Sequence, residues 1–311
     1  MDIKHIIKYG IKLMTSYQRR FNFLAQMGLY NRLPDEEFIR RLYKANRGKE
    51  LNLENPRTFN EKLQWMKLYD RNPVYVVTSD KYAVRDYVKE KIGEEYLVPL
   101  IGVWDDPDDI DFSALPEQFV LKCNHNSGTG MCICKDKSRL NTEKVKKALK
   151  KGLNEDYFLC SREWQYKDIK RRIVGEKFMS AIDTDDLINY KIYCFNGEPK
   201  LFHISSNMAA HNGARLSFLD LDWNPLPFCR QDYPPFEELP PQPESKEEML
   251  EVSRKLSENL PFMRVDLYEI GGKVYFSELT LDPCGGYSPF EPEIWDLKLG
   301  EMLKLPEKKK V

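Results

Sequence analysis

The stretch FVLKCNHNSGTGMCICK, residues 119–135, decides how the rest of the chain is interpreted. It predicts a β-strand that carries Lys122, a loop of small residues over 124–130, and a second strand that ends at Lys135. Small residues leave the backbone N–H groups of a loop free to surround an anion, and a lysine on the entering strand can contact the same anion. The stretch therefore fits a loop that covers phosphates, and it also fits a plain hairpin, which is commoner. It lacks the P-loop pattern, so that nucleotide motif is excluded.

Composition limits the class of protein. With 311 residues, of which 41% are hydrophobic, the chain is long enough for a sizeable core and two or three subdomains. Lys and Arg number 48 against 49 Asp and Glu, which gives no reason to expect a nucleic-acid partner. The seven scattered cysteines indicate reduced thiols and a cytoplasmic protein rather than a disulfide framework.

The N-terminal residues 3–28 place apolar side chains at helical spacing, with Lys4, Lys8 and Lys12 along the other side. This pattern predicts a basic amphipathic helix. Such a helix fits peripheral contact of residues 1–28 with an anionic membrane, at the inner face of the plasma membrane. It also fits a helix packed on the body of the protein, which is the more common case.

Helix start signals organise the first hundred residues. Thr58 followed three residues later by Glu61 predicts a capping box. The elements predicted here are a helix from Pro34-Asp35, a helix from Thr58, a helix opening at Ser79-Asp80-Lys81 and closing at Gly93, and an apolar strand over 96–104.

The second half of the chain has the alternation of antiparallel strands. The elements predicted there are a basic helix over 141–157, a strand over 172–180, a hairpin turned by Asn196-Gly197, another over 214–226, a helix over 246–260, a last hairpin over 263–279 and a tight turn at Cys284-Gly285-Gly286. The whole pattern predicts the α+β class.

In the last hairpin, Arg264 and Asp266 are two residues apart and point to the same face, and Glu278 lies near the end of the partner strand. Two carboxylates from adjacent strands beside an arginine fit a Mg²⁺ site, since magnesium takes oxygen ligands and shares them with substrate phosphates. They also fit a cross-strand ion pair on a solvated face. Lys81 and Lys122, with the loop over 124–130, favour the metal site.

Several motifs recur in one order: Asp80-Lys81, FVLKCNHNSGTG, residues 176–179, Arg264-Val-Asp266 and Glu278-Leu-Thr280. In that order they resemble the ATP-grasp superfamily of carboxylate-amine ligases. LNLENPRTFNEKLQWMKLYDRNP, SREWQYK, NYKIYCFNGEPK and SELTLDPCGGY are similar to the TupA-like branch of teichuronopeptide biosynthesis. The similarity runs from about residue 45 to about residue 290.

The resemblance implies an ATP-grasp fold, with a nucleotide site between a small α+β subdomain and a larger antiparallel-sheet subdomain, preceded by a helical N-terminal region. The implied divisions are a helical extension over 1–44, the N-terminal region of the module over 45–105, the small subdomain over 106–178, the C-terminal subdomain with the metal site over 179–300, and a basic tail over 301–311.

The resemblance also implies roles for individual residues. Asp266, Glu278 and Thr280 correspond to ligands of Mg²⁺, although Thr280 stands where many members have asparagine. Arg264 and Lys122 correspond to the catalytic cations that face the transferring phosphoryl group. His125, in the phosphate loop, fits either a phosphate contact or exposure to solvent. The residues that correspond to the ATP site are Lys81, Lys122, Asn126, Ser127, Gly128, Thr129, Gly130, Glu176, Lys177, Phe178, Met179, Asp183, Asp186 and Lys191.

The implied activity is ATP- and Mg²⁺-dependent ligation of an amine, such as an amino acid, to a carboxylate through an acylphosphate. The carboxylate is expected on a uronic acid of a bacterial surface-polysaccharide precursor, and Arg162, Arg171, Arg172, His203 and Arg215 are candidates for holding it. Two alternatives remain open. One is a glycosyltransferase or kinase of the same pathway, and the other is a non-catalytic membrane-surface protein with a vestigial nucleotide site.

Overall fold

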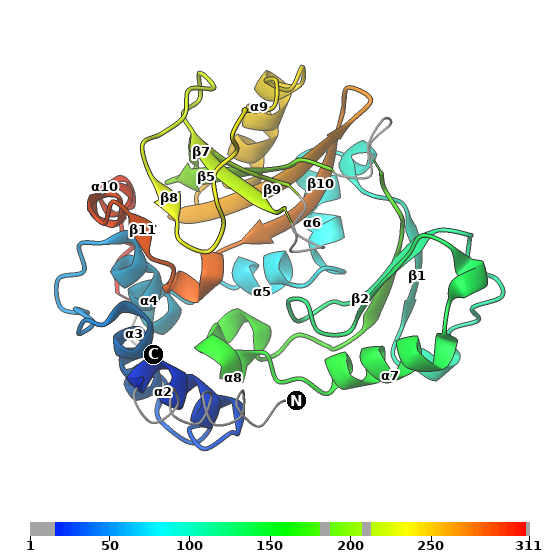
Figure 1. The fold of residues 1–311 in the computed structure, drawn as a ribbon, viewed down its shortest axis with the longest axis horizontal. Helices are drawn as coiled ribbons and strands as arrows, with labels where there is room; N and C mark the ends of the chain where they lie inside the picture. The colour runs from blue at the N-terminus through cyan, green and yellow to red at the C-terminus, as the bar shows by residue number, and fades with distance from the viewer. Residues whose placement is uncertain (1–15, 181–186, 207–212, 309–311) are drawn as a thin grey trace. The chain divides into compact units, whose positions relative to one another are not determined.

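The computed structural model describes residues 16–180, 187–206 and 213–308 of the chain. Contacts divide the chain into two compact units, the first comprising residues 1–71, 158–164 and 282–311, and the second comprising 72–157 and 165–281. Helices are combined with antiparallel sheets (Figure 1), so the predicted α+β class is confirmed. The subdomain boundaries predicted from the sequence stay predictions.

The first unit is mainly helical. Phe21 is buried, its ring stacked on Tyr30 at 4.8 Å and tilted against Phe38 at 5.9 Å. The elements of this unit are α2 (Tyr17–Gln26), α3 (Asp35–Arg47), α4 (Phe59–Tyr69), α8 (Phe158–Ser161), the 3-10 turn η5 (Pro283–Gly286), β11 (Phe290–Glu291) and α10 (Ile294–Met302).

The predicted N-terminal helix is confirmed for the part that forms α2, and residues 1–15 lie outside the described residues. The predicted start of α3 is also confirmed, with three acidic residues in its first turn. Among the described residues, no helix has the length and apolar character needed to cross a membrane.

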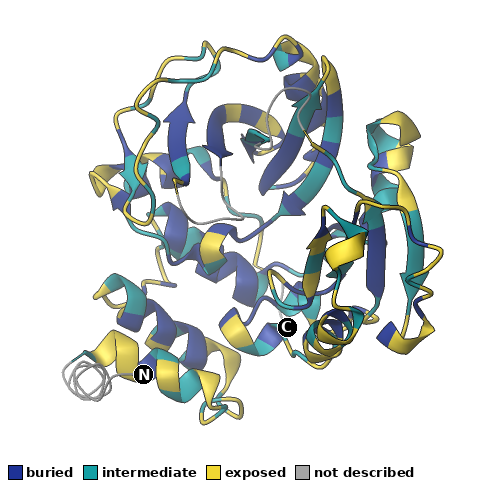
Figure 2. Cartoon of the chain, turned by 45° about the vertical axis from the view of Figure 1, so that its right-hand side comes forward, coloured by how far each residue is buried: buried dark blue, intermediate teal, exposed yellow. Residues whose placement is uncertain are grey.

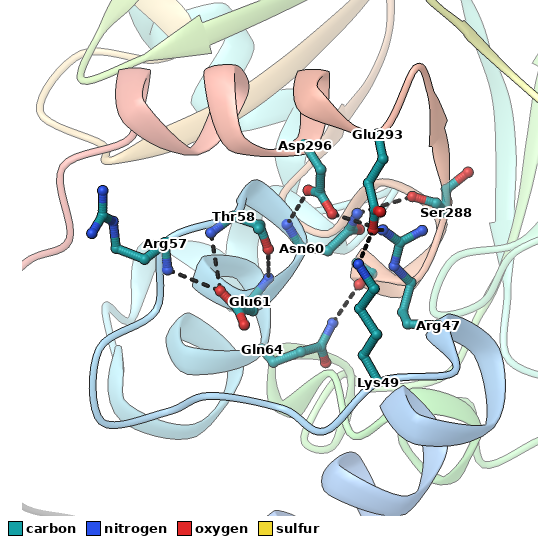
Figure 3. Close-up of polar contacts among 11 residues, drawn as sticks. Arg47, Lys49, Arg57, Thr58, Asn60, Glu61, Gln64, Ser288, Glu293 and Asp296 are labelled. Atoms are coloured by element: carbon teal, nitrogen blue, oxygen red, sulfur yellow. Dashed lines mark hydrogen bonds and ion pairs between the residues drawn. The ribbon is translucent and has the colours of Figure 1, made fainter.

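The capping box predicted at the start of α4 is present. The Thr58 hydroxyl accepts the Glu61 N–H at 3.2 Å, and the Glu61 carboxylate accepts the Thr58 N–H at 3.0 Å. Figure 3 shows both bonds, with the Glu61 carboxylate also reaching the backbone of Arg57 at 2.9 Å. Three backbone donors at the helix start are thereby satisfied.

Replacing Thr58 by alanine is expected to lower the free energy of unfolding by about 1 kcal/mol, because the hydroxyl that accepts the N–H of the third helical residue is lost. Thr58→Ser keeps that hydroxyl and is the matched control. Urea denaturation measures both variants. An alanine variant as stable as the serine variant would show that α4 does not depend on this cap.

The helix predicted to close at Gly93 is present, but its predicted start at Ser79 is wrong. Instead α5 (Val74–Ser79) ends there and α6 (Val84–Lys91) begins five residues later. The Asp80 carboxylate accepts the Tyr82 N–H at 2.8 Å and an Asn124 side-chain N–H at 2.8 Å. These bonds hold the segment in a turn, because they compete with the helical bonding of the same groups. Lys81 therefore lies in a turn between two helices.

Four antiparallel strands form the smaller sheet of the second unit, in the order β1-β4-β2-β3, which confirms the predicted strand–loop–strand. Phe119 and Leu121 are fully buried and share a hydrophobic cluster with Val145 and Leu149. Because side chains alternate along a strand, Lys122 lies on the face opposite that cluster. The elements are β1 (Leu100–Trp104), β2 (Phe119–Cys123), β3 (Met131–Cys134), β4 (Ile173–Lys177) and α7 (Thr142–Leu153), which packs on β2 and β3.

Five antiparallel strands form the larger sheet, in the order β10-β9-β5-β6-β7. Figure 2 shows these strands largely in the colour of buried residues. They are β5 (Asn189–Phe195), β6 (Glu198–Ser206), β7 (Arg215–Leu219), β9 (Phe262–Ile270) and β10 (Lys273–Thr280); α9 (Lys246–Leu256) contacts β5, β6 and β9, and β8 (Cys229–Arg230) is a short strand beside β7.

The two faces of the larger sheet have different roles. Cys194 Sγ lies 3.8 Å from the Ser253 carbonyl oxygen of α9, so the side of β5 that carries Cys194 and Ile192 faces this helix. The alternate residues Lys191 and Tyr193 point the other way. We call the face that carries Lys191 the front face and the face covered by α9 the back face.

Two of the hairpins predicted in the larger sheet are confirmed, whereas the stretch over 214–226 contributes only the strand β7, with an isolated bridge between Leu219 and Pro225. Asn196 and Gly197 have φ values of 53° and 81°, as a tight two-residue hairpin turn requires. Gly271 and Gly272, with φ of 59° and 73°, turn β9 into β10 in the same way. Both hairpins also contain a register shift, between Tyr193 and Cys194 and between Phe276 and Glu278, so the turns and these bulges together determine which side chains meet on the front face.

Candidate functional site

A cluster of charged side chains lies on the front face where β9 and β10 pair. Asp266 is directly opposite Glu278, and Arg264 is directly opposite Thr280. Arg264 binds both Asp266 oxygens, at 2.6 Å from Nε and 2.7 Å from Nη2, and Nη2 also lies 2.9 Å from Glu278 Oε1 and 2.9 Å from Thr280 Oγ1. The four residues predicted as the metal and phosphoryl site are therefore brought together.

Lys191 extends this cluster from the neighbouring strand β5. It is opposite Asp266 in the register, and its Nζ lies 2.8 Å from Asp266 Oδ2. Asp266 is fully buried, so its charge depends on these two cationic partners. Burial alone would raise the pKa of Glu278, but the positive charges of Arg264, Lys191 and Lys81 outweigh that effect and lower it to about 2. The Glu278 carboxylate is therefore suited to remain anionic at neutral pH.

The donor set of the cluster fits a hard divalent cation. Three oxygens, from Asp266, Glu278 and Thr280, converge on the single cationic nitrogen Arg264 Nη2, within 2.9 Å. Carboxylate and hydroxyl oxygens are the ligands that Mg²⁺ prefers, and two carboxylates are sufficient where substrate phosphates supply the rest. Among the described residues there is no group of three or more His, Cys, Asp and Glu side chains that would hold a metal without such help.

Lys81 and Lys122 lie near each other and near the cluster. Burial lowers the pKa of Lys81; the anionic Glu278 opposes that shift, and the positive charge of Lys122 adds to it. Lys122 Nζ lies 2.5 Å from Glu176 Oε2, and Arg85 Nη1 lies 3.5 Å from the other oxygen of Glu176. Sequence reasoning missed Arg85, which is on α6 and gives no signal of its own. Lys122 and Glu176, both predicted as nucleotide-site residues, form an ion pair here.

The loop after β2 is anchored at both ends. Asn126 is buried, and its side chain donates to Glu155 Oε2 at 2.9 Å, while Thr129 Oγ1 lies 3.3 Å from Glu155 Oε1. Lys81 Nζ donates to the carbonyl oxygen of Asn126. His125 is buried rather than exposed, with Nε2 3.1 Å from the backbone oxygen of Glu155. Glu155, which sequence reasoning did not identify, thus holds the predicted phosphate loop in place.

The glycines of this loop have different environments. Gly130 packs against Gly152 of α7, and a Cβ on Gly130 would lie 2.8 Å from the Gly152 Cα. Gly128 has a φ of 83° and no neighbour that a Cβ would meet among the described residues, and it is exposed together with Ser127. The end of the loop is therefore packed, and its exposed part is centred on residues 127–128.

The predicted adenine hinge, residues 176–179, begins in the last two residues of β4 and continues beyond the strand. The Lys177 N–H donates to the Pro99 carbonyl at 3.0 Å, and the Phe178 ring lies 5.6 Å from Lys135 Nζ. Lys177 is exposed, and Phe178 and Met179 are partly exposed. Asp183 and Asp186, predicted for the ribose, lie outside the described residues.

In the first unit, η5 forms a left-handed turn. Cys284, Gly285 and Gly286 have φ of 52°, 64° and 72°. The Gln64 side chain donates to the carbonyl oxygens of Gly285 and Gly286 at 3.1 and 2.7 Å, and Lys67 Nζ donates to that of Gly285 at 2.8 Å. The tight turn predicted here is confirmed.

The polar stripe on α4 that supports this turn was not predicted. It contains Asn60, Gln64 and Lys67, and the Asn60 side chain donates to Ser288 O at 2.9 Å (Figure 3). Burial lowers the pKa of Lys67 to about 8, against the opposing effect of the buried carboxylates of Asp282 and Glu163. The spacing of four and three residues between the polar side chains is the sequence signal that indicates such a stripe.

The arginines considered for an acidic acceptor have partners outside the cluster, and those of Arg171 and Arg172 are the Leu153 carbonyl and Asp105. Arg162 belongs to the first unit, is 1% exposed and lies 4.3 Å from the Phe38 ring centre. Arg215 pairs with Glu237 at 2.7 Å. His203, by contrast, is on the front face, directly opposite Lys191.

Comparisons with known proteins extend these observations. A family model described as TupA-like ATPgrasp matches residues 61–304. A search of curated proteins gave no match. Among solved structures, similarity was found to D-alanine–D-alanine ligase from Bacillus anthracis complexed with ATP, with 16% identity, a TM-score of 0.39, and coverage of 66% of this chain and 54% of that chain.

Two further solved structures are similar at the same level. For D-alanine–D-alanine ligase from Helicobacter pylori the identity is 14%, the TM-score 0.42, and the coverage 79% of this chain and 69% of that chain. For L-amino acid ligase from Bacillus licheniformis the identity is 12%, the TM-score 0.37, and the coverage 86% of this chain and 56% of that chain. The match spans little more than half the length of the Bacillus anthracis ligase.

Proposed function

This chain belongs to the TupA-like ATP-grasp family, and we propose on that premise that it is an ATP-dependent ligase joining a carboxylate to an amine. Membership confirms the ATP-grasp fold predicted from the sequence. The observation that carries the proposal is the front-face cluster, in which Asp266, Glu278 and Thr280 surround the guanidinium of Arg264 beside Lys191.

The nucleotide is proposed to bind with its triphosphate toward this cluster. Lys81, Lys122 and Lys191 supply positive charge for the phosphate oxygens, and the anchored loop with its exposed Ser127 and Gly128 would cover them. The Lys122–Glu176 ion pair would then exchange partners, so that Lys122 contacts phosphate. Residues 176–179 would contact adenine, and Asp183 or Asp186 the ribose.

Asp266 and Glu278, with Thr280, would hold Mg²⁺, which supplies Lewis-acid stabilisation of charge on the phosphate oxygens when bound. Their three converging oxygens are the observation that supports this assignment. Arg264 binds both carboxylates and Lys191 binds Asp266, and both cations would neutralise phosphoryl oxygens when the carboxylates hold the metal. Positioning and electrostatic stabilisation are what phosphoryl transfer requires of a protein.

The proposed reaction has two steps. A substrate carboxylate oxygen attacks the γ-phosphorus, the bond to the β-phosphate oxygen breaks, and an acylphosphate and ADP form. An amine then attacks the acyl carbon, phosphate leaves with the bonding pair, and loss of the amine proton gives the amide. Arg264 stabilises negative charge in the first step, and closure of the loop over 124–130 would exclude water from the acylphosphate.

The carboxylate is proposed to belong to a uronic acid of a bacterial surface-polysaccharide precursor, and the amine to an amino acid. The resemblance to the teichuronopeptide branch supports this choice, and the cations Arg264 and Lys191 on the front face are suited to contact a carboxylate. We place the reaction in the cytoplasm. A peripheral contact with an anionic membrane through residues 1–28 remains part of the proposal, although residues 1–15 lie outside the described structure.

The function is tested by incubating the protein with Mg²⁺, ATP, a panel of uronic acids and a panel of amino acids, and measuring ADP and amide. ADP formation that requires both an acid and an amine is expected, with a mass-spectrometric product equal to their condensation. ADP formation with a phosphorylated product and no amide would identify a kinase. Transfer from nucleotide-sugars without ATP consumption would identify a glycosyltransferase, and either result would contradict the ligase.

A further inference from the structure

A row of directly opposed residues crosses the front face of the larger sheet. Starting from Glu278 on β10, the register joins Asp266, then Lys191, then His203 on β6 and finally Phe218 on β7. Directly opposed residues in antiparallel strands point to the same face, with Cβ atoms about 5 Å apart. The charged cluster therefore continues without a break into a second polar region on β6.

This second region has a neighbouring pair of opposed residues, Asn189 on β5 and Ser205 on β6. Asn189 is two positions from Lys191 on β5, and Ser205 is two positions from His203 on β6. These four residues therefore form a square on one face. We call these four residues the polar square. His203 is 2% exposed and Ser205 is fully buried.

The polar square contains buried polar atoms without partners. His203 Nδ1, His203 Nε2, Ser205 Oγ and Asn189 Oδ1 have no hydrogen-bond partner among the residues that the structure describes. Buried polar groups are nearly always hydrogen-bonded, and a buried one left unpaired costs stability. Four such atoms next to one another, beside the reactive cluster, indicate that a ligand supplies the missing partners.

The chemistry of these atoms limits the ligand. Asn189 Oδ1 and one imidazole nitrogen need hydrogen-bond donors, whereas Ser205 and the other imidazole nitrogen can donate. Hydroxyl groups satisfy both needs. Ammonium groups also donate, but burial and the positive charges of Lys191, Arg230 and Arg264, which lower the pKa of His203, make the region hostile to another cation.

We propose that the polar square is the subsite that binds the hydroxyl groups of the proposed sugar-acid substrate. Its hydroxyls would bond His203, Ser205 and Asn189, and its carboxylate would lie toward Lys191 and Arg264, where the phosphoryl group is received. This inference rests on the proposed function and adds to it the place where the acid binds and the side chains that bind its hydroxyl groups. The amine substrate is not expected to bind in the polar square.

The test compares wild type with Ser205→Ala in the presence of Mg²⁺ and a non-hydrolysable ATP analogue. Isothermal titration measures binding of the analogue, then of D-glucuronate, D-galacturonate and D-gluconate, with acetate as the acid that lacks hydroxyls. We expect wild type to bind at least one sugar acid and to prefer it to acetate. Ser205→Ala should weaken that binding roughly tenfold and leave binding of the ATP analogue unchanged.

Ser253→Ala is the matched control. Ser253 is also a fully buried serine whose hydroxyl has no partner among the described residues, but it belongs to α9 on the back face. Both substitutions remove an unpaired buried hydroxyl, so neither variant should unfold at a lower temperature than wild type. Only Ser205→Ala should lose affinity for sugar acids.

The outcomes separate this inference from the proposed function. Binding of the ATP analogue without binding of any sugar acid, or equal sugar-acid binding by Ser205→Ala and wild type, overturns the inference and leaves the ligase proposal in place. A lower unfolding temperature for Ser205→Ala would assign the hydroxyl a structural role and also overturn it. A wild type that does not bind the ATP analogue removes the proposed function, and the inference falls with it.

Discussion

Replacing Glu278 by glutamine is expected to lower the rate of ADP formation about 10²–10³-fold, as typically follows when one electrostatic contact to a transferring group is lost. Glutamine keeps the shape and an oxygen that accepts the bond from Arg264 Nη2, which is 2.9 Å from Glu278 in the native chain. The negative charge is lost, and since the pKa of Glu278 is lowered to about 2, that charge is present in the wild type at neutral pH. The side chain is 43% exposed, so the fold should survive the change.

The measurement is ADP formation as a function of Mg²⁺ concentration, which should show both a lower maximal rate and a higher Mg²⁺ requirement. Glu258→Gln is the matched control, because Glu258 is also an exposed carboxylate in an ion pair, with Lys91 at 2.9 Å, and belongs to the same unit. The control should keep the wild-type rate. Equal rates for both variants would remove Glu278 from the site.

Replacing Gly300 by alanine is expected to destabilise the first unit by about 3 kcal/mol, near the upper end of the cost of overpacking. Gly300 lies in α10 against the start of α4, and a Cβ there would be 2.2 Å from the carbonyl oxygen of Arg57 and 2.8 Å from the backbone nitrogen of Phe59. The clash is with backbone atoms, so a side-chain rotation cannot relieve it. The capping box and the Asn60–Asp296 contact nearby (Figure 3) must shift together with these backbone atoms.

Helix propensity alone predicts that Gly300→Ala stabilises the protein, since alanine favours a helix over glycine by about 1 kcal/mol. The sign of the change in chemical denaturation therefore decides between contact and propensity. Gly48→Ala is the control in the same unit, because Gly48 has a φ of 68° and no neighbour that a Cβ would meet among the described residues. It should cost only the backbone strain, about 1–2 kcal/mol. A more stable Gly300→Ala would show that α10 and α4 are not closely packed there.

Local signals in the sequence predicted the parts of the fold that local chemistry determines. The capping box at Thr58, the turn at Asn196-Gly197 and the hairpin carrying Arg264, Asp266 and Glu278 each depend on residues close together in the chain or joined by one short turn. The meeting of Asp266 and Glu278 was predicted too, but alternation alone does not produce it, because a register shift between Phe276 and Glu278 brings Glu278 opposite Asp266. The order of the motifs then led to the correct family.

Contacts between distant segments could not be predicted in this way. Asp80 leaves the helical pattern because its carboxylate bonds Asn124, and no local feature announces that partner. His125 is buried because Glu155 closes over its loop. The place of His203 beside Lys191 depends on the register of β5 and β6, and only the structure reveals that its nitrogens have no partner among the described residues.

The most direct test of the ATP site is thermal unfolding of the wild type and of Lys122→Ala with Mg²⁺ and ATP together and separately. A ligand that binds only the native state raises the unfolding temperature by mass action. We predict a rise for wild type that requires both Mg²⁺ and ATP and is largely lost in Lys122→Ala. The absence of any rise in wild type would contradict an ATP site on this chain.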